Sequence, residues 1–333
     1  MPPETIARWR RLRVSATFRR LSLAGRRTRE GENHMANVDT AQSKDGRSSH
    51  TGPKILVDGG DPAETMRVKE ALGYVDGQTT NPSLIAKNPE VKKRVESGRA
   101  LTEAEESAAY RKIVQEISPL VGSAGVSIEV FADLDTTADQ MLKQGQEMFT
   151  WIPNAYVKYP CTREGLKAAQ RSVAQGMRVN MTLCFSQEQA AAVYAATKGT
   201  KAPSYVSPFV GRLDDIGWNG MDLLANIKRM FASGDGHTLI LGASIRSLPH
   251  LMRCFQIGVD LVTAPAKVIL EWVEAGRPMP DANFRYEFNG KPMEYREIDL
   301  NQPWQNFDIK HELTDKGIRK FVEDYRSTLR KAS

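Results

Sequence analysis

The chain has 333 residues, of which 41% are hydrophobic and 26% charged, the balance of a globular protein. No apolar run is long enough to span a bilayer, which excludes an integral membrane protein. The three cysteines stand far apart without a CxxC pair, which argues against a disulfide scaffold or a cysteine-built zinc site and favours a reducing compartment, the cytoplasm.

The positive charge is confined to one end of the chain. Residues 1–34 hold nine Arg and three Glu, which accounts for the whole net charge of +6. The rest of the chain is neutral, so we expect no nucleic-acid partner and no membrane partner for the folded body. We interpret residues 1–53 as a disordered Arg-rich extension and linker, with Met35 as an alternative start. An organellar targeting peptide at residues 1–34 is the other interpretation.

From residue 54 onward, short apolar runs alternate with longer segments of helical periodicity. Eight runs are predicted to be strands, at residues 55–58, 74–80, 126–131, 155–160, 178–185, 204–209, 238–244 and 260–265. Segments with apolar residues three and four positions apart are predicted to be helices, at residues 61–72, 102–117, 136–149, 163–175, 186–197, 219–231, 248–257 and 265–275.

Eight strand–helix units are typical of an α/β protein, a closed (β/α)8 TIM barrel, with an open doubly wound sheet as the alternative. No GxGxxG motif follows the first strand and no GxxxxGK[ST] motif occurs, so neither a dinucleotide site nor a P-loop is indicated. Residues 281–310 break the alternation and are predicted to cross the barrel surface, before a terminal amphipathic helix at 312–329. Residues 54–333 are thus expected to form one domain.

Catalytic residues of such barrels lie at the carboxyl ends of the strands, and three ionisable residues occur late in the apolar runs: Asp58, Glu129 and Lys158. If Lys158 points inward, lost hydration disfavours its charge, lowers its pKa and makes the amine a nucleophile for a carbonyl carbon. The alternative is a lysine whose head group reaches out of the barrel mouth.

The two carboxylates have structural alternatives as well. Asp58 and Glu129 could divide proton-transfer work if their surroundings differ. Asp58 could instead cap the following helix, although Asp61 fits that role better, and Glu129 could form an ion pair with a neighbouring base. No histidine lies near a strand end, so no metal site is predicted.

Two arginines follow the late strands, where barrels of this kind often bind phosphate. Arg212 lies a few residues beyond the sixth run, and Ser244 and Arg246 follow the seventh. Each arginine alone could be a solvated surface charge, but the pair favours a phosphate site because guanidinium groups bind phosphate in a bidentate manner.

These residues occur in blocks that resemble the transaldolase family of class I aldolase barrels. The similar segments, in the family's order, are DGQTTNPSLIAK (76–87), VSIEVFADL (126–134), YVKYPCTREGL (156–166), VNMTLCFSQEQA (179–190), SPFVGRLDDIG (207–217), GASIR (242–246) and GIRKFVEDY (317–325). The resemblance covers about residues 55–330. It departs at the first strand, where this chain has DGGD in place of D-T-x-D.

The resemblance implies a transaldolase of the pentose phosphate pathway. Such an enzyme transfers a dihydroxyacetone unit from sedoheptulose 7-phosphate or fructose 6-phosphate to glyceraldehyde 3-phosphate or erythrose 4-phosphate. It implies a Schiff base at Lys158, proton transfer from the C4 hydroxyl at Asp58, and a catalytic water held by Glu129 and Thr182. The implied substrate contacts are Asn81, Asn180, Ser207, Phe209, Arg212, Ser244 and Arg246. Sugar phosphates are the implied partners, no metal or organic cofactor is implied, and a homo-oligomer is compatible.

Two alternatives stay open at this point. Fructose 6-phosphate aldolases are related barrels that tend to be shorter, with Gln at the position of Glu129 and Tyr at the position of Phe209, so both positions favour the transferase. A non-catalytic sugar-phosphate-binding barrel would retain the arginines but need not keep Lys158, Asp58 and Glu129 together.

Overall fold

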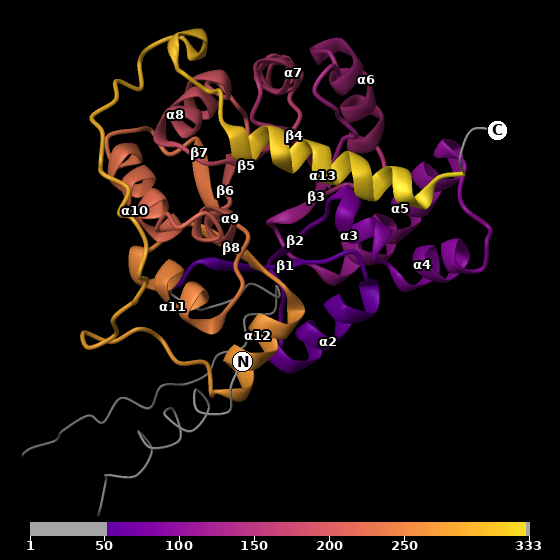
Figure 1. The fold of residues 1–333 in the computed structure, drawn as a ribbon, viewed down its shortest axis with the longest axis horizontal. Helices are drawn as coiled ribbons and strands as arrows, with labels where there is room; N and C mark the ends of the chain where they lie inside the picture. Colours follow the sequence, from indigo (N-terminus) through magenta and orange to yellow (C-terminus); the bar gives the residue numbers. More distant parts are fainter. Residues whose placement is uncertain (1–51, 331–333) are drawn as a thin grey trace, which may run out of the picture. The chain divides into compact units, whose positions relative to one another are not determined.

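The computed structural model describes residues 52–330, so the predictions for the Arg-rich tail lie outside the described residues. Eight parallel strands close into one barrel, and their order round the barrel is their order in the chain (Figure 1). The strands are β1 (Lys54–Asp58), β2 (Gly77–Thr79), β3 (Gly125–Glu129), β4 (Ala155–Pro160), β5 (Val179–Cys184), β6 (Ser204–Pro208), β7 (Thr238–Gly242) and β8 (Leu261–Ala264). The prediction of a closed (β/α)8 barrel is confirmed.

Helices connect successive strands. They are α2 (Pro62–Leu72), α3 (Pro82–Ala86), α4 (Pro89–Glu96), α5 (Glu103–Ile117), α6 (Ala138–Phe149), α7 (Arg163–Ala174), α8 (Gln187–Ala196), α9 (Val210–Asp214), α10 (Gly220–Phe231), α11 (Leu248–Ile257), α12 (Ala266–Glu274) and the terminal α13 (Glu312–Thr328). Side chains that accept a hydrogen bond from the first turn fix many of the starts, among them Asp61, Thr102, Thr137, Thr162 and Ser186.

The structure corrects two details of the prediction. The second strand, expected over residues 74–80, is only the three residues of β2. Just before it, the Asp76 carboxylate accepts the Ile55 N–H at 2.8 Å, so a side chain replaces a strand carbonyl there. Helices α3, α4 and α9 were not predicted, because α3 and α9 have five residues each and α4 has only one buried side chain. Such segments carry too little hydrophobic periodicity to be recognised.

The barrel interior changes from apolar to polar along the strands. Toward the amino-terminal ends of the strands the interior is a small apolar cluster, made of Leu56, Ala124, Tyr156, Tyr205, Leu241 and Leu261. The rings of Tyr156 and Tyr205 stack within it, with 4.2 Å between their centroids. Side chains two positions further along a strand lie on the same face, one layer nearer its carboxyl end. That step replaces Leu56 by Asp58, Tyr156 by Lys158 and Tyr205 by Ser207. The strand period of two therefore places polar groups above an apolar floor.

The segment between α12 and α13 runs along the outside of the barrel helices (Figure 1). It contains no strand, and its only helical turn is the 3-10 turn η2 (Trp304–Asn306). Side chains of the barrel helices bind its backbone: Asn226 of α10 donates to the Met293 carbonyl at 2.7 Å and Gln187 of α8 donates to the Arg296 carbonyl at 3.1 Å. These bonds lead the chain to the point where α13 begins.

Helix α13 then returns across the open end of the barrel, where it contacts β5 and α3 (Figure 1). Near its start, the Thr314 hydroxyl donates to the Leu183 carbonyl at 2.9 Å, and near its end Asp324 accepts a hydrogen bond from the Ser83 hydroxyl. The helix is thus fastened at both ends over the carboxyl ends of the strands.

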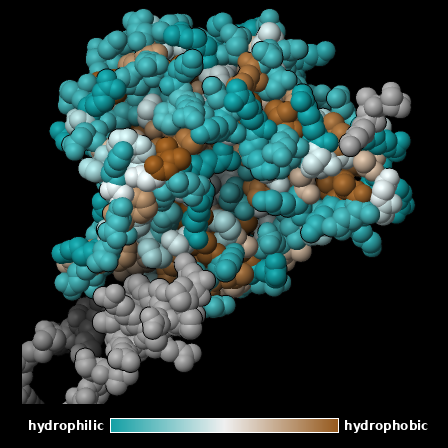
Figure 2. All heavy atoms as spheres, viewed as in Figure 1, coloured by the Kyte–Doolittle hydropathy of each residue, from teal (hydrophilic) through white to brown (hydrophobic). Residues whose placement is uncertain are grey.

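The face of the molecule shown in Figure 2 is mostly hydrophilic, with small separate hydrophobic areas. No helix described between residues 52 and 330 combines the length and the hydrophobicity that crossing a bilayer requires. The cysteines at 161, 184 and 254 are all free and buried.

Candidate functional site

A cavity of about 270 Å³ opens at the carboxyl ends of the strands, beneath α13. Eight of the predicted site residues line it: Asp58, Asn81, Lys158, Ser207, Phe209, Arg212, Ser244 and Arg246. The other three, Glu129, Asn180 and Thr182, lie behind this wall and are almost fully buried. A concave site with a few convergent polar groups is typical of a small-molecule pocket.

Lys158 is the buried cation at the floor of the cavity. Its side chain is 3% exposed, and Nζ lies 3.0 Å from Glu129 Oε2 and donates to the Thr80 carbonyl at 3.3 Å. The ring of Phe209 lies 5.9 Å from Nζ. The alternative in which the lysine head group reaches out of the barrel mouth is wrong, because the ammonium is enclosed on the inner side.

Glu129 faces Lys158 from the neighbouring strand, since the two residues are register partners between β3 and β4. The 3.0 Å contact is an ion pair, and among the described residues Glu129 Oε2 has no hydrogen-bond partner of good geometry. Burial raises the pKa of Glu129, and the charge of Lys158 opposes the rise. The ion pair considered in the sequence analysis is therefore present, and its basic partner is Lys158.

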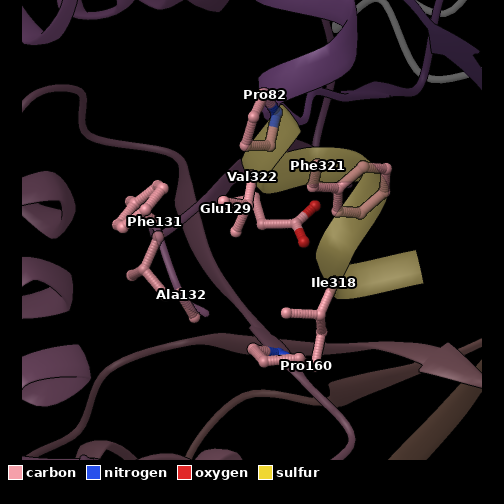
Figure 3. Close-up of a pocket in the computed structure, with 9 residues that line it drawn as sticks. Pro82, Glu129, Phe131, Ala132, Pro160, Ile318, Phe321 and Val322 are labelled. Atoms are coloured by element: carbon pink, nitrogen blue, oxygen red, sulfur yellow. The ribbon is translucent and has the colours of Figure 1, made fainter. Parts of the chain in front are cut away.

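A cavity of about 10 Å³, close to the volume of a single water, lies next to Glu129. Figure 3 shows the Glu129 carboxylate between Pro82 and Phe321, with Pro160 and Ile318 on the other side. On β5, the strand beyond Lys158, the Thr182 hydroxyl is buried and has no hydrogen-bond partner among the described residues. An unsatisfied hydroxyl of this kind is a place where an ordered water is expected.

Asp58 ends β1 on the opposite side of the cavity. Its Oδ1 accepts a 2.7 Å hydrogen bond from Thr79, whose hydroxyl is also 2.7 Å from that of Thr263. Burial raises the pKa of Asp58, while Lys158 and the Thr79 hydrogen bond oppose the rise. Asp61 caps helix α2, so the alternative in which Asp58 serves as the helix cap is wrong.

The remaining predicted polar residues of β5 and β6 form a network. Asn180 donates to Ser127 at 3.0 Å and accepts from Ser207 at 2.7 Å. Asn180 is the register partner of Lys158, so the network holds the strand beside the lysine. Asn81 caps α3 by accepting the Leu84 N–H at 3.0 Å, and this holds its side chain at the cavity wall.

Two guanidinium groups form the cationic side of the cavity. Arg212 is held between the rings of Phe209 and Phe321, each 5.3 Å from its Cζ. Arg246 forms a two-point ion pair with Asp215, one contact being 2.7 Å. Arg212, which is partly exposed and supported by the two rings, and the exposed Arg246 are both suited to a phosphate group.

The backbone around these arginines is unusually close. Ser244 has a φ of 59°, and a Cβ at Gly211 would lie 2.5 Å from the Ser244 carbonyl oxygen and 2.6 Å from Arg246 Nε. Only glycine permits that approach. Left-handed backbone at a non-glycine residue is strained, and such strain clusters at functional sites.

Several further residues line the cavity that no sequence pattern indicated: Thr79, Ser83, Leu84, Lys87, Ala243, Thr263, Lys320, Phe321 and Asp324. Lys320 of α13 pairs with Asp324 at 2.9 Å and Glu323 at 3.1 Å. The amphipathic pattern of α13 predicted a helix but gave no sign that the helix would cover the site. Among residues 52–330 no group of three or more His, Cys, Asp or Glu side chains is placed to hold a metal ion.

Comparison with known proteins gives a consistent picture. The family model described as transaldolase/fructose-6-phosphate aldolase matches residues 55–332. The chain is similar to a probable transaldolase of Maricaulis maris, with 38% identity over 83% of this chain and 97% of the relative. It is also similar to probable transaldolases of Cereibacter sphaeroides, with 41% identity over 65% of this chain and 86% of the relative, and of Paracoccus denitrificans, with 36% identity over 83% and 97%.

Proposed function

Since this chain belongs to the transaldolase/fructose-6-phosphate aldolase family, we propose that it transfers a dihydroxyacetone unit from a ketose phosphate to an aldose phosphate through a Schiff base at Lys158. One observation carries the proposal: the Lys158 amine is buried at the floor of a cavity that has carboxylates near the amine and two arginines on its wall. A sugar phosphate fits this site, because its carbonyl group can react with the amine and its phosphate group can bind the arginines.

The reaction begins with a proton leaving the Lys158 ammonium. Glu129, 3.0 Å away and with a pKa raised by burial, is placed to take this proton. The neutral amine attacks the C2 carbonyl of the ketose, and loss of water from the resulting carbinolamine gives an iminium. Arg212 and Arg246 hold the phosphate at the far end of the substrate.

Carbon–carbon cleavage then falls to Asp58. Its carboxylate takes the proton of the C4 hydroxyl, the C3–C4 bond breaks, and the electron pair passes to the iminium, leaving an enamine of the three-carbon unit. The aldose phosphate departs, and a second aldose phosphate accepts the unit by the reverse steps. Addition of water to the new iminium, near Glu129 and Thr182, releases the ketose product. Phe209 places an apolar ring near the amine, which favours retaining the enamine over early hydrolysis.

Borohydride reduction tests this proposal. Treatment with fructose 6-phosphate and borohydride is expected to add one reduced three-carbon unit to a peptide containing Lys158. Lys158→Ala should abolish the adduct, while Lys167→Ala, which removes an exposed lysine of α7, should leave it unchanged. A coupled assay with sedoheptulose 7-phosphate and glyceraldehyde 3-phosphate measures transfer. Absence of the adduct would refute the proposal, and release of free dihydroxyacetone as the main product would favour an aldolase.

A further inference from the structure

A second cavity, of about 80 Å³, lies behind Glu129 on the side away from Asp58 and the arginines. We refer to it as the back cavity; its polar lining is Glu106, Ser107, Tyr110, Glu129, Gln144 and Tyr325. Ser107, Gln144 and Tyr325 are partly exposed, so they form its rim, whereas Glu106, Tyr110 and Glu129 are buried. The volume is sufficient for several waters.

Glu106 is the unexplained group in this cavity. It is 6% exposed, and its carboxyl group makes no hydrogen bond or ion pair with any described residue. The titratable groups that face it are Tyr110 on its own helix α5, Tyr325 on α13 and, across the cavity, Glu129 on β3. The exposed Glu103 acts on the same Tyr325, and within residues 52–330 no cation compensates Glu106. A buried carboxyl group without a partner destabilises a fold, so its presence calls for a chemical reason.

Glu129 connects the back cavity with the substrate cavity. It lines the back cavity and also the water-sized cavity shown in Figure 3, and its carboxylate contacts the Lys158 ammonium. Phe321 separates the water-sized cavity from the substrate cavity, since it lines both. Glu129 can therefore exchange a proton with Lys158 on one side and with water on the other.

The proposed chemistry benefits from a route by which water reaches Glu129 without passing the substrate. A ketone and the ammonium form of lysine give an iminium and one water, and the reverse step consumes one water. Each transfer therefore releases one water and takes one up, while the sugar phosphate fills the front of the site. Water and protons that reach Glu129 from behind do not compete with the substrate for space.

We propose that the back cavity holds the water exchanged during formation and hydrolysis of the iminium, and that Glu106 passes protons between this water and Glu129. The inference rests on the proposed function. Glu106 does not touch the substrate; it is a positioning residue that acts through Glu129. When Glu129 has received the lysine proton, Glu106 accepts a proton through the intervening water, and it returns a proton in the reverse step.

The test uses the whole chain and oxygen-18 water. An enzyme that forms the iminium reversibly transfers solvent oxygen to the carbonyl group of fructose 6-phosphate, and mass spectrometry follows this incorporation. Glu106→Gln keeps the shape and removes the titratable proton. We expect it to slow incorporation about tenfold, which is less than the roughly hundredfold or more typical of a group that transfers the proton directly, because Glu106 acts through Glu129. KM for the ketose should stay within about twofold of the wild type. Glu116→Gln, an exposed change on the same helix, is the matched control and should behave as the wild type.

A rescue experiment separates proton transfer from structural support. Glu106→Ala leaves space for a small acid, so added formate should restore incorporation in this variant and have no effect on the wild type or on Glu116→Gln. If Glu106→Gln exchanges oxygen at the wild-type rate, or formate leaves Glu106→Ala slow, the inference is wrong. If instead the wild type yields no borohydride adduct, the function proposed for Lys158 fails, a result that the Glu106 variants alone cannot produce.

Discussion

Glu106→Gln should make the protein relatively more stable as the pH rises. The Glu106 carboxyl group is buried without a partner among the residues that the structure describes, and burial alone raises its pKa to about 7 from an ordinary value of 4.5. The unfolded chain releases this proton near the ordinary value. Between the two values the folded state binds more protons than the unfolded state, so the stability of the wild type falls as the pH rises. Glutamine has the same shape and does not titrate.

The magnitude follows from the two pKa values. At about 1.4 kcal/mol per pKa unit, the difference between 4.5 and about 7 corresponds to about 3 kcal/mol. Glu106 therefore destabilises the wild type by nothing below pH 4.5 and by this full amount above pH 7. The difference in unfolding free energy between Glu106→Gln and the wild type should therefore shift by about 3 kcal/mol in favour of the variant over this range. Other titrating groups cancel in the difference.

Urea unfolding of both proteins, and of the exposed control Glu116→Gln, at several pH values between 4.5 and 8 measures this difference. The control should show a difference that stays nearly constant, because Glu116 is at the helix surface. A difference between Glu106→Gln and the wild type that is equally flat would show that the carboxyl group is solvated or paired. The position of Glu106 would then need no chemical explanation.

Three further predictions concern the front of the site. Thr79→Val removes the hydrogen bond that lowers the pKa of Asp58, so the acid limb of the pH–rate profile should move to higher pH, and Thr79→Ser should restore it. Phe209→Tyr should increase the release of free dihydroxyacetone, measured against transfer; no increase over the parent would contradict the role given to this ring. Gly317→Ala brings a methyl group within 2.6 Å of Arg212 Nη1, so KM for the ketose phosphate should rise by about tenfold while kcat changes little. An unchanged KM would contradict a phosphate contact that depends on the present position of the Arg212 guanidinium.

The sequence indicates those residues of the candidate site that stand at or just after strand ends, but not those that other segments contribute. The step of two along a strand is a local property, so Asp58, Lys158 and Ser207 could be found from the apolar runs alone. Asp324 meets Ser83 across 241 positions of the chain, and no local pattern announces that contact. Phe321, likewise, became part of the site only when α13 crossed the barrel mouth.

The structural alternatives for the Lys158 and Glu129 side chains were decided by where the residues lie in the barrel. Lys158 is enclosed because its strand β4 lies between β3 and β5. It contacts Glu129 because the register of β3 and β4 makes the two residues partners. In the sequence, Glu106 is one of several acidic residues in the first turn of a helix, and nothing local distinguishes it. It is buried because α5, α6 and α13 pack together around it.

The amino-acid sequence by itself determined the repeated strands and helices, the closed barrel and the line of polar residues at the strand ends, because hydrophobic periodicity and helix capping act over a few residues. The tertiary structure alone decided which carboxylate pairs with the lysine, which helix covers the site and which acid is left unpaired behind it. Those outcomes depend on strand register and on contacts between distant segments, since desolvation of a charge is a property of everything packed around it.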